Sequence, residues 1–123
     1  MNWKKRILIV DDQPAVLMLM VYLLTSAECE VVAAKNGTEA IRHAQKEEFD
    51  LVITDIDAPG INGFEICAYL KQDFRFVRTP VIFISDHYWE EDRRRSLEFG
   101  AADYIKKPLD GAIFAKRVLA HIK

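Results

Sequence analysis

Five side chains that could do chemistry together stand directly after short apolar runs of this 123-residue chain. They are three carboxylates, one hydroxyl and one ammonium: Asp11, Asp12, Asp55, Ser85 and Lys107. Carboxylates that lie a few ångströms apart repel one another, so such a cluster needs a cation among its members or raised pKa values. An all-oxygen, carboxylate-rich cluster suits a hard cation, Mg²⁺ before Zn²⁺.

Strand-like and helix-like patterns alternate five times along the chain, and they must bring these side chains together. The expected strands are 7–10, 30–34, 51–55, 81–84 and 104–105, and the expected helices are 14–27, about 37–47, 63–71, 87–99 and 113–122. This series predicts one α/β domain over residues 1–123, with a doubly wound five-stranded parallel sheet in the order 2-1-3-4-5. The carboxyl ends of parallel strands meet at one edge, where ligands bind.

Composition excludes several classes of protein. The net charge of −2 gives no sign of direct nucleic-acid binding. No apolar run approaches the roughly 18 residues that a membrane span needs, so we expect a soluble, cytoplasmic protein. Cys29 and Cys67 have neither a metal-ligand spacing nor a secretory context, and they are expected to be reduced thiols.

The first predicted helix is apolar nearly all round. Its expected buried stripe is Val16, Leu19, Met20, Leu23 and Leu24. Four further apolar residues fall where a surface helix should be polar: Leu17, Met18, Val21 and Tyr22. They form either a docking or dimer patch or an ordinary hydrophobic surface, and the sequence leaves both readings open.

The five site residues and their order resemble the receiver domain of two-component response regulators. The resemblance covers essentially the whole chain, and it rests on Asp11-Asp12, Asp55, Ser85 and Lys107-Pro108. The separations from Asp55 to Ser85 and from Ser85 to Lys107 are also typical of that family. Each short motif is weak alone, but the ordered set is specific.

The resemblance implies that Asp55 accepts a phosphoryl group with the help of Mg²⁺. Asp12 would hold the ion directly, Asp11 partly through water, and Asp57 through its backbone carbonyl. Lys107 would pair first with Asp55 and then with a phosphoryl oxygen. The donor would be a sensor histidine kinase or a histidine phosphotransfer domain, and the chain would catalyse only its own phosphorylation and dephosphorylation.

Two further residues complete the implied site. Ser85 would donate its hydroxyl to a phosphoryl oxygen, and the bond between Lys107 and Pro108 would be cis. Tyr104 would turn inward as Ser85 moves toward the phosphoryl group. The face that changes would comprise the fourth helix, the fifth strand and the fifth helix.

Two surfaces are implied as contacts with other proteins. The phosphodonor would dock near the first helix, including Leu17, Met18 and Val21. On the changing face, Asp103 and Arg117 match an ion pair that DNA-binding receivers use across a two-fold dimer. Ala102 and Ile113 stand where charges are usual in that subfamily, so a homodimer is an open alternative.

Asp86 is the main departure from the family pattern, because a small residue normally follows Ser85. It either caps the fourth helix or places a negative charge at the entrance to the site. With His87 beside it and Asp57 on the opposite loop, it could tune the rates of labelling and hydrolysis.

Two other functions compete with a phosphorylated receiver. One is a degenerate receiver that acts as a phosphorylation-independent interaction domain, and the presence of all five site residues argues against it. The other is a phosphohydrolase of the haloacid dehalogenase type, which Asp55-Ile56-Asp57 would fit. That enzyme needs an acidic pair after its lysine, whereas only Asp110 follows Lys107.

Overall fold

The computed structural model describes residues 4–87 and 90–122, and these build a five-stranded parallel sheet. The strands lie in the order β2-β1-β3-β4-β5, which confirms the predicted topology. Their bounds are β1 Arg6–Val10, β2 Glu30–Ala34, β3 Leu51–Asp55, β4 Val81–Ser85 and β5 Asp103–Lys106. β3, at the centre, is buried along its whole length.

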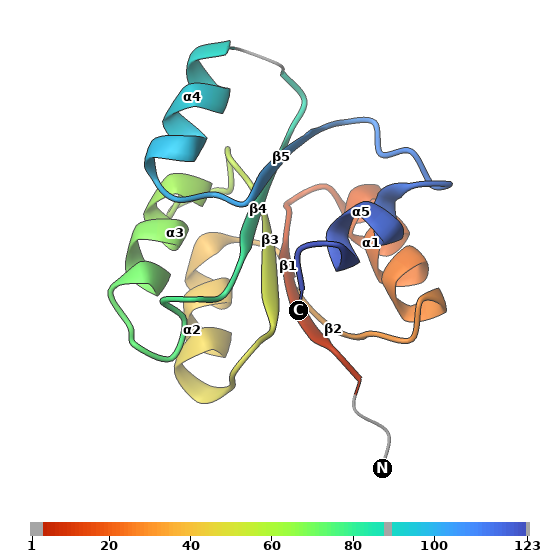
Figure 1. The fold of residues 1–123 in the computed structure, drawn as a ribbon, viewed down its shortest axis with the longest axis horizontal. Helices are drawn as coiled ribbons and strands as arrows, with labels where there is room; N and C mark the ends of the chain where they lie inside the picture. Colours follow the sequence, from red (N-terminus) through yellow and green to blue (C-terminus); the bar gives the residue numbers. More distant parts are fainter. Residues whose placement is uncertain (1–3, 88–89, 123) are drawn as a thin grey trace.

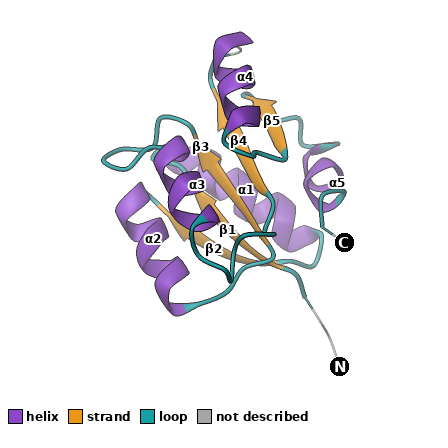
Figure 2. Cartoon of the chain, turned by 60° about the vertical axis from the view of Figure 1, so that its left-hand side comes forward, coloured by secondary structure: helices purple, strands orange, loops and turns teal. Residues whose placement is uncertain are grey.

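Helices cover both faces of the sheet. They are α1 Pro14–Ser26, α2 Gly37–Lys46, α3 Gly63–Lys71, α4 Glu90–Glu98 and α5 Phe114–Leu119. Figure 1 shows α1 and α5 on one side of the strands and α2, α3 and α4 on the other. Figure 2 shows the sheet between these two helical layers.

The period of two along the strands divides the core into two halves. On β1, Ile7 and Ile9 belong to the apolar cluster beneath α1 and α5, while Leu8 and Val10 belong to the cluster beneath α2 and α3. All four side chains are fully buried. A parallel sheet covered on both faces needs such continuous apolar strands, and this is why the runs are recognisable in the sequence.

Two helix predictions differ from the structure. Leu19, expected in the buried stripe of α1, is 38% exposed, whereas Met20 and Leu24 are fully buried. The last helix was expected over 113–122 but spans Phe114–Leu119. Beyond Leu119 the amides of His121 and Ile122 reach carbonyls three residues back, which is the tighter turn common at helix ends.

The helix expected over 87–99 is described from Glu90, because residues 88 and 89 lie outside the described residues. Over the described chain, no helix is long and apolar enough to cross a membrane.

Two glycines let the loop after β3 pack closely. Gly63 opens α3, and a Cβ on it would lie 2.7 Å from the carbonyl oxygen of Asp55. Gly37 opens α2, and a Cβ there would collide with the backbone of Ile61. Since Asp55 ends the central strand, the fit of Gly63 also sets where that residue's backbone lies.

We predict that Gly63→Ala lowers the free energy of unfolding by about 1–3 kcal/mol, because the added methyl group forces the backbone of β3 and α3 apart. Urea unfolding followed by circular dichroism measures the change. Gly111→Ala is the matched control, since its Cβ would meet only Leu23 Cδ2 at 3.7 Å. Equal losses in the two variants would contradict this account of Gly63.

Candidate functional site

The predicted site residues converge at the carboxyl edge of the sheet. Asp55 and Ser85 are the last residues of β3 and β4, Asp11 follows β1, and Lys107 follows β5. These four residues are buried. The parallel topology therefore brings together groups that are far apart in the sequence.

Lys107 joins the two buried carboxylates. Its Nζ lies 3.0 Å from Asp55 Oδ2 and 2.7 Å from Asp11 Oδ2. Burial alone would lower the pKa of Lys107, but hydrogen bonds and charge attraction from the two carboxylates raise it overall. Lys107 is therefore an ammonium, and the expected contact between it and Asp55 is present. The expected cis bond before Pro108 is also present.

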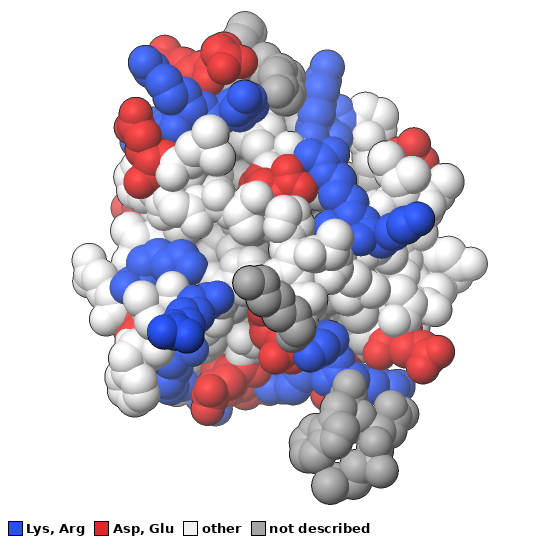
Figure 3. Space-filling model, viewed as in Figure 1, with Lys and Arg blue, Asp and Glu red and all other residues white. Residues whose placement is uncertain are grey.

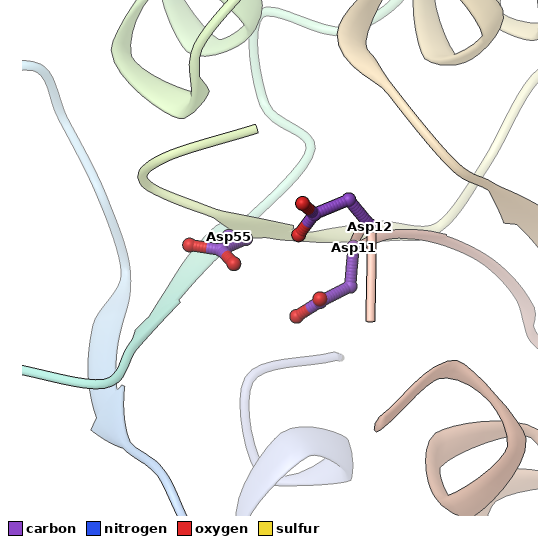
Figure 4. Close-up of side chains that lie close together, drawn as sticks. All are labelled: Asp11, Asp12 and Asp55. Atoms are coloured by element: carbon purple, nitrogen blue, oxygen red, sulfur yellow. The ribbon is translucent and has the colours of Figure 1, made fainter. Parts of the chain in front are cut away.

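Asp11, Asp12 and Asp55 form an acidic cluster, and Figure 4 shows their side chains converging. One carboxylate oxygen from each lies within 4.8 Å of the others. Asp11 Oδ1 accepts a hydrogen bond from the amide of Gln13 at 2.8 Å, while its buried Oδ2 is near Lys107 without hydrogen-bond geometry. Burial raises the pKa of Asp11, and the nearby charge of Asp55 adds to the rise.

This donor set fits a hard divalent cation. All three groups offer oxygen, which suits Mg²⁺. Asp12 is exposed, while both oxygens of Asp11 already face protein donors. The geometry therefore leaves Asp12 as the more accessible ligand.

The backbone after β3 fixes the orientation of Asp55. Its Oδ1 accepts a hydrogen bond from the amide of Asp57 at 2.9 Å, and its Oδ2 accepts one from Lys107 at 3.0 Å. Each carboxylate oxygen accepts one hydrogen bond, so the orientation of the Asp55 carboxylate at the carboxyl edge of the sheet is fixed.

Ser85 and Tyr104 are linked through the loop after β4. Ser85 Oγ accepts a hydrogen bond from the amide of His87 at 3.1 Å, and the Tyr104 hydroxyl donates to the carbonyl of His87 at 2.7 Å. The Tyr104 side chain is buried, with 7% of the residue exposed. The two residues expected to move together therefore share one neighbour.

Three charged or titratable residues stand in the loops that follow β3 and β4: Asp57, Asp86 and His87, all exposed. Asp57 is exposed, but partial desolvation of its carboxyl raises its pKa, as does the charge of Asp55. The charges of Asp92 and Asp86 add to the rise in this pKa, and His87 opposes it. The capping role considered for Asp86 depends on residues 88 and 89, which lie outside the described residues. That role stays a prediction.

Asp103 and Arg117, on the face formed by α4, β5 and α5, pair with each other within the one chain. Arg117 donates to Asp103 through Nε and Nη2, both at 2.8 Å. His121, which the sequence reading missed, lies 3.0 Å from the same carboxylate. Burial alone would raise the pKa of Asp103, but these partners lower it to about 2.

The apolar surface of α1 is exposed as expected. Met18 and Tyr22 are 72% and 69% exposed, Val21 is 37% exposed and Leu17 is half-buried. They line an open apolar groove of about 510 Å³ beside Ala33 of β2.

Three consecutive arginines of α4, Arg93, Arg94 and Arg95, do not form a purely basic patch. Figure 3 shows blue and red side chains intermixed over this helix, because Glu90, Glu91 and Asp92 precede the arginines. Arg95 stacks over the Phe64 ring, with its Cζ 4.3 Å from the ring centroid. At least this arginine has a packing role.

The sequence reading also missed Gln13. Its Oε1 accepts a hydrogen bond from Lys107 Nζ at 3.0 Å. The one available signal was its position, since a glutamine stands just before Pro14, where helix-capping residues are usual.

Comparison with known proteins agrees with this geometry. Residues 7–119 match the family model of the response regulator receiver domain. The chain is 35% identical to Protein PilH of Pseudomonas aeruginosa over 94% of its own length and 95% of that protein. It is 33% identical to the transcriptional regulatory protein PhoP of Bacillus subtilis over 97% of its own length, but it spans only 49% of PhoP.

Solved structures show the same fold. The chemotaxis response regulator CheY4 of Vibrio cholerae superposes with a TM-score of 0.92 at 26% identity, covering 98% of this chain and 100% of that chain. Together with the family match and the residues at the sheet edge, this likeness shows that the chain belongs to the response regulator receiver domain family.

Proposed function

We propose that this chain is a phosphorylation-activated switch of a two-component system and that Asp55 is its phosphoacceptor. One observation carries the proposal: Asp55 ends the central strand, where its carboxylate contacts the Lys107 ammonium and belongs to the acidic cluster. A nucleophilic carboxylate beside a fixed cation and a metal-binding cluster is the arrangement that phosphoryl transfer to aspartate requires.

In the proposed reaction, an oxygen of Asp55 attacks the phosphorus of a phosphohistidine. The new O–P bond forms as the P–N bond breaks, and the electron pair leaves with the imidazole nitrogen, which takes up a proton. Lys107 and the Ser85 hydroxyl then face the phosphoryl oxygens. Hydrolysis returns the Asp55 carboxylate and releases inorganic phosphate.

Donor and acceptor are both anionic, so their approach needs positive charge. Mg²⁺ held by Asp12 directly, by Asp11 partly through water, by Asp55 and by the Asp57 carbonyl would offset that repulsion. Among the described residues, Lys107 is the only positively charged side chain that contacts Asp55.

The proposed output is a shift of the α4-β5-α5 face. Because Ser85 and Tyr104 contact the same residue, His87, a change at the phosphoryl site would alter the packing of Tyr104. Phosphorylation would bias an equilibrium between two existing states. In a homodimer through this face, the Asp103–Arg117 ion pair within each chain would have to break, and each residue would pair with its counterpart in the other chain.

The proposed partner is a cytoplasmic histidine kinase or histidine phosphotransfer domain. The apolar surface of α1, formed by exposed Met18 and Val21 and half-buried Leu17, supports docking there, because an uncharged helix face suits an apolar partner surface. The chain would act on no other substrate than its own aspartyl phosphate.

Asp55→Asn should abolish labelling, because the amide cannot supply the anionic oxygen that attacks phosphorus. The measurement is intact mass after incubation with acetyl phosphate and Mg²⁺, followed by peptide mapping. Asp50→Asn, an exposed aspartate at the opposite edge of the sheet, should label like the wild type. Normal labelling of Asp55→Asn, or an unlabelled wild type, would favour the degenerate-receiver alternative.

Asp12→Asn should weaken Mg²⁺ binding by about tenfold or more, since it removes a direct ligand. Asp11→Asn should weaken it less, because Asp11 remains engaged by Lys107 and the amide of Gln13. Calorimetric titration with Mg²⁺ measures both affinities. The opposite ranking would reverse the two assigned roles.

Removing the charge of Asp86 should speed both labelling by acetyl phosphate and hydrolysis by up to about fivefold, because an exposed charge near the entrance repels anions weakly. Asp86→Asn is the sharper variant, since asparagine caps a helix as well as aspartate does. Asp86→Ala should speed both reactions as much as Asp86→Asn does, and it should also remove the helix cap.

The two Asp86 variants separate the explanations. Urea unfolding gives the stability of each, and phosphate release gives the hydrolysis rate. If Asp86→Asn reacts like the wild type while Asp86→Ala loses about 1 kcal/mol of stability, capping is the whole role of Asp86.

A further inference from the structure

We propose that Gln13 is a positioning residue that holds the Lys107 ammonium in place for phosphoryl transfer. The inference rests on the proposed function of Asp55. It assigns a role to a side chain that lies outside the acidic cluster and outside the aspartate, serine and lysine set.

The Lys107 ammonium makes two hydrogen bonds and one ion pair. An ammonium has three N–H donors and no acceptor. Lys107 Nζ lies 2.7 Å from Asp11 Oδ2, 3.0 Å from Asp55 Oδ2 and 3.0 Å from Gln13 Oε1. Three oxygen atoms from two segments, the β1–α1 loop and the end of β3, thus surround one nitrogen, and Gln13 provides the neutral one.

Gln13 occupies a position where a different role is usual. It stands at the N-cap of α1, directly before Pro14, yet its side chain makes no capping hydrogen bond. Serine, threonine, aspartate and asparagine are preferred there because their short side chains reach the first helical amides. The longer glutamine side chain instead reaches across to Lys107, so it contributes to the site at the expense of the helix end.

The backbone of Gln13 is itself fixed by the site. Its amide donates to Asp11 Oδ1 at 2.8 Å, and its carbonyl accepts from the amides of Val16 and Leu17, both at 3.1 Å. The start of α1 is therefore tied to the end of β1. From this fixed base, the Gln13 side chain reaches Lys107 Nζ.

The contact between Gln13 and Lys107 becomes more important as the reaction proceeds. When Asp55 carries a phosphoryl group, it loses the carboxylate charge that attracts Lys107, and the ammonium must turn to a phosphoryl oxygen. Asp11 belongs to the acidic cluster, so its charge is shared with any cation there. Gln13 lies outside that cluster. Its amide oxygen carries no charge that phosphorylation or a bound cation would change, so its contact with Nζ would persist.

Two variants distinguish positioning from a structural role at the helix end. Gln13→Asn keeps an acceptor but is one methylene too short to reach Lys107, and it is a better helix cap. Gln13→Met keeps the length but offers no comparable acceptor. Gln72→Asn is the matched control, at an exposed glutamine that ends α3.

The first readout is the initial rate of acetyl phosphate labelling at saturating Mg²⁺, with stability measured in parallel by urea unfolding. Both Gln13 variants should label about tenfold more slowly, because a misplaced cation stabilises the transferring group less. Gln13→Asn should be as stable as the wild type or more so. The control should match the wild type in both measurements.

The second readout needs no phosphorylation. It is the rate at which the Lys107 ammonium protons exchange with water in Mg²⁺-free protein, followed by ¹⁵N NMR and assigned by the loss of the signal in Lys107→Arg. Both Gln13 variants should exchange severalfold faster. The Lys71 ammonium, which donates to the Thr79 carbonyl at 2.6 Å, is the internal reference and should not change.

Wild-type labelling rates in both Gln13 variants would overturn the inference and leave the phosphoacceptor role of Asp55 intact. Slower labelling that only tracks lost stability would overturn it as well. If the wild type itself takes no label, the proposed function fails, and unchanged Lys107 exchange in the variants would then refute the contact directly.

Discussion

The buried ammonium of Lys107 is the interaction on which the site depends. Asp11 and Asp55 come from neighbouring strands, and the parallel topology forces their carboxylates to the same edge. Without a cation between them, two buried carboxylates would repel and favour protonation. Lys107 contacts both, so one side chain makes the convergence of three strand ends tolerable. Removing one member of such a buried set is costly because the other charges stay behind uncompensated.

The fold and the main site residues were predictable from sequence because they depend on simple periods. Alternating strands and helices predict the parallel sheet, and the sheet places Asp55 and Lys107 at one edge, whereas their pairing was implied by the family resemblance. Gln13 and His121 were missed because their contacts depend on side-chain reach across the fold, which no period encodes. The predictions that Leu19 is buried and that the last helix reaches residue 122 were wrong. Local packing decides the burial of Leu19 and turn geometry decides where α5 ends, and apolar character predicts neither.

A chain of contacts runs from the site to the face expected to change. Ser85 accepts from the amide of His87, and Tyr104 donates to the carbonyl of that residue. Arg117 in turn donates to the backbone carbonyl of Tyr104 at 3.2 Å while it holds Asp103. The contacts therefore run from Ser85 through His87 and Tyr104 to Arg117. This contiguity gives a physical route for coupling between the two sites.

The charged cluster also limits how a dimer could form. With a pKa of about 2 against an ordinary 3.8, Asp103 is ionised at neutral pH, and the stability it contributes is lost as pH falls from about 3.8 through about 2. Protonation therefore cannot release Arg117 under physiological conditions. An Arg117 from a second chain would have to compete with the one already bound, and the net gain would be the difference between two similar ion pairs. A dimer through this face must then draw its stability from other contacts, and Leu97 and Ile113, 56% and 50% exposed, offer apolar surface beside the cluster.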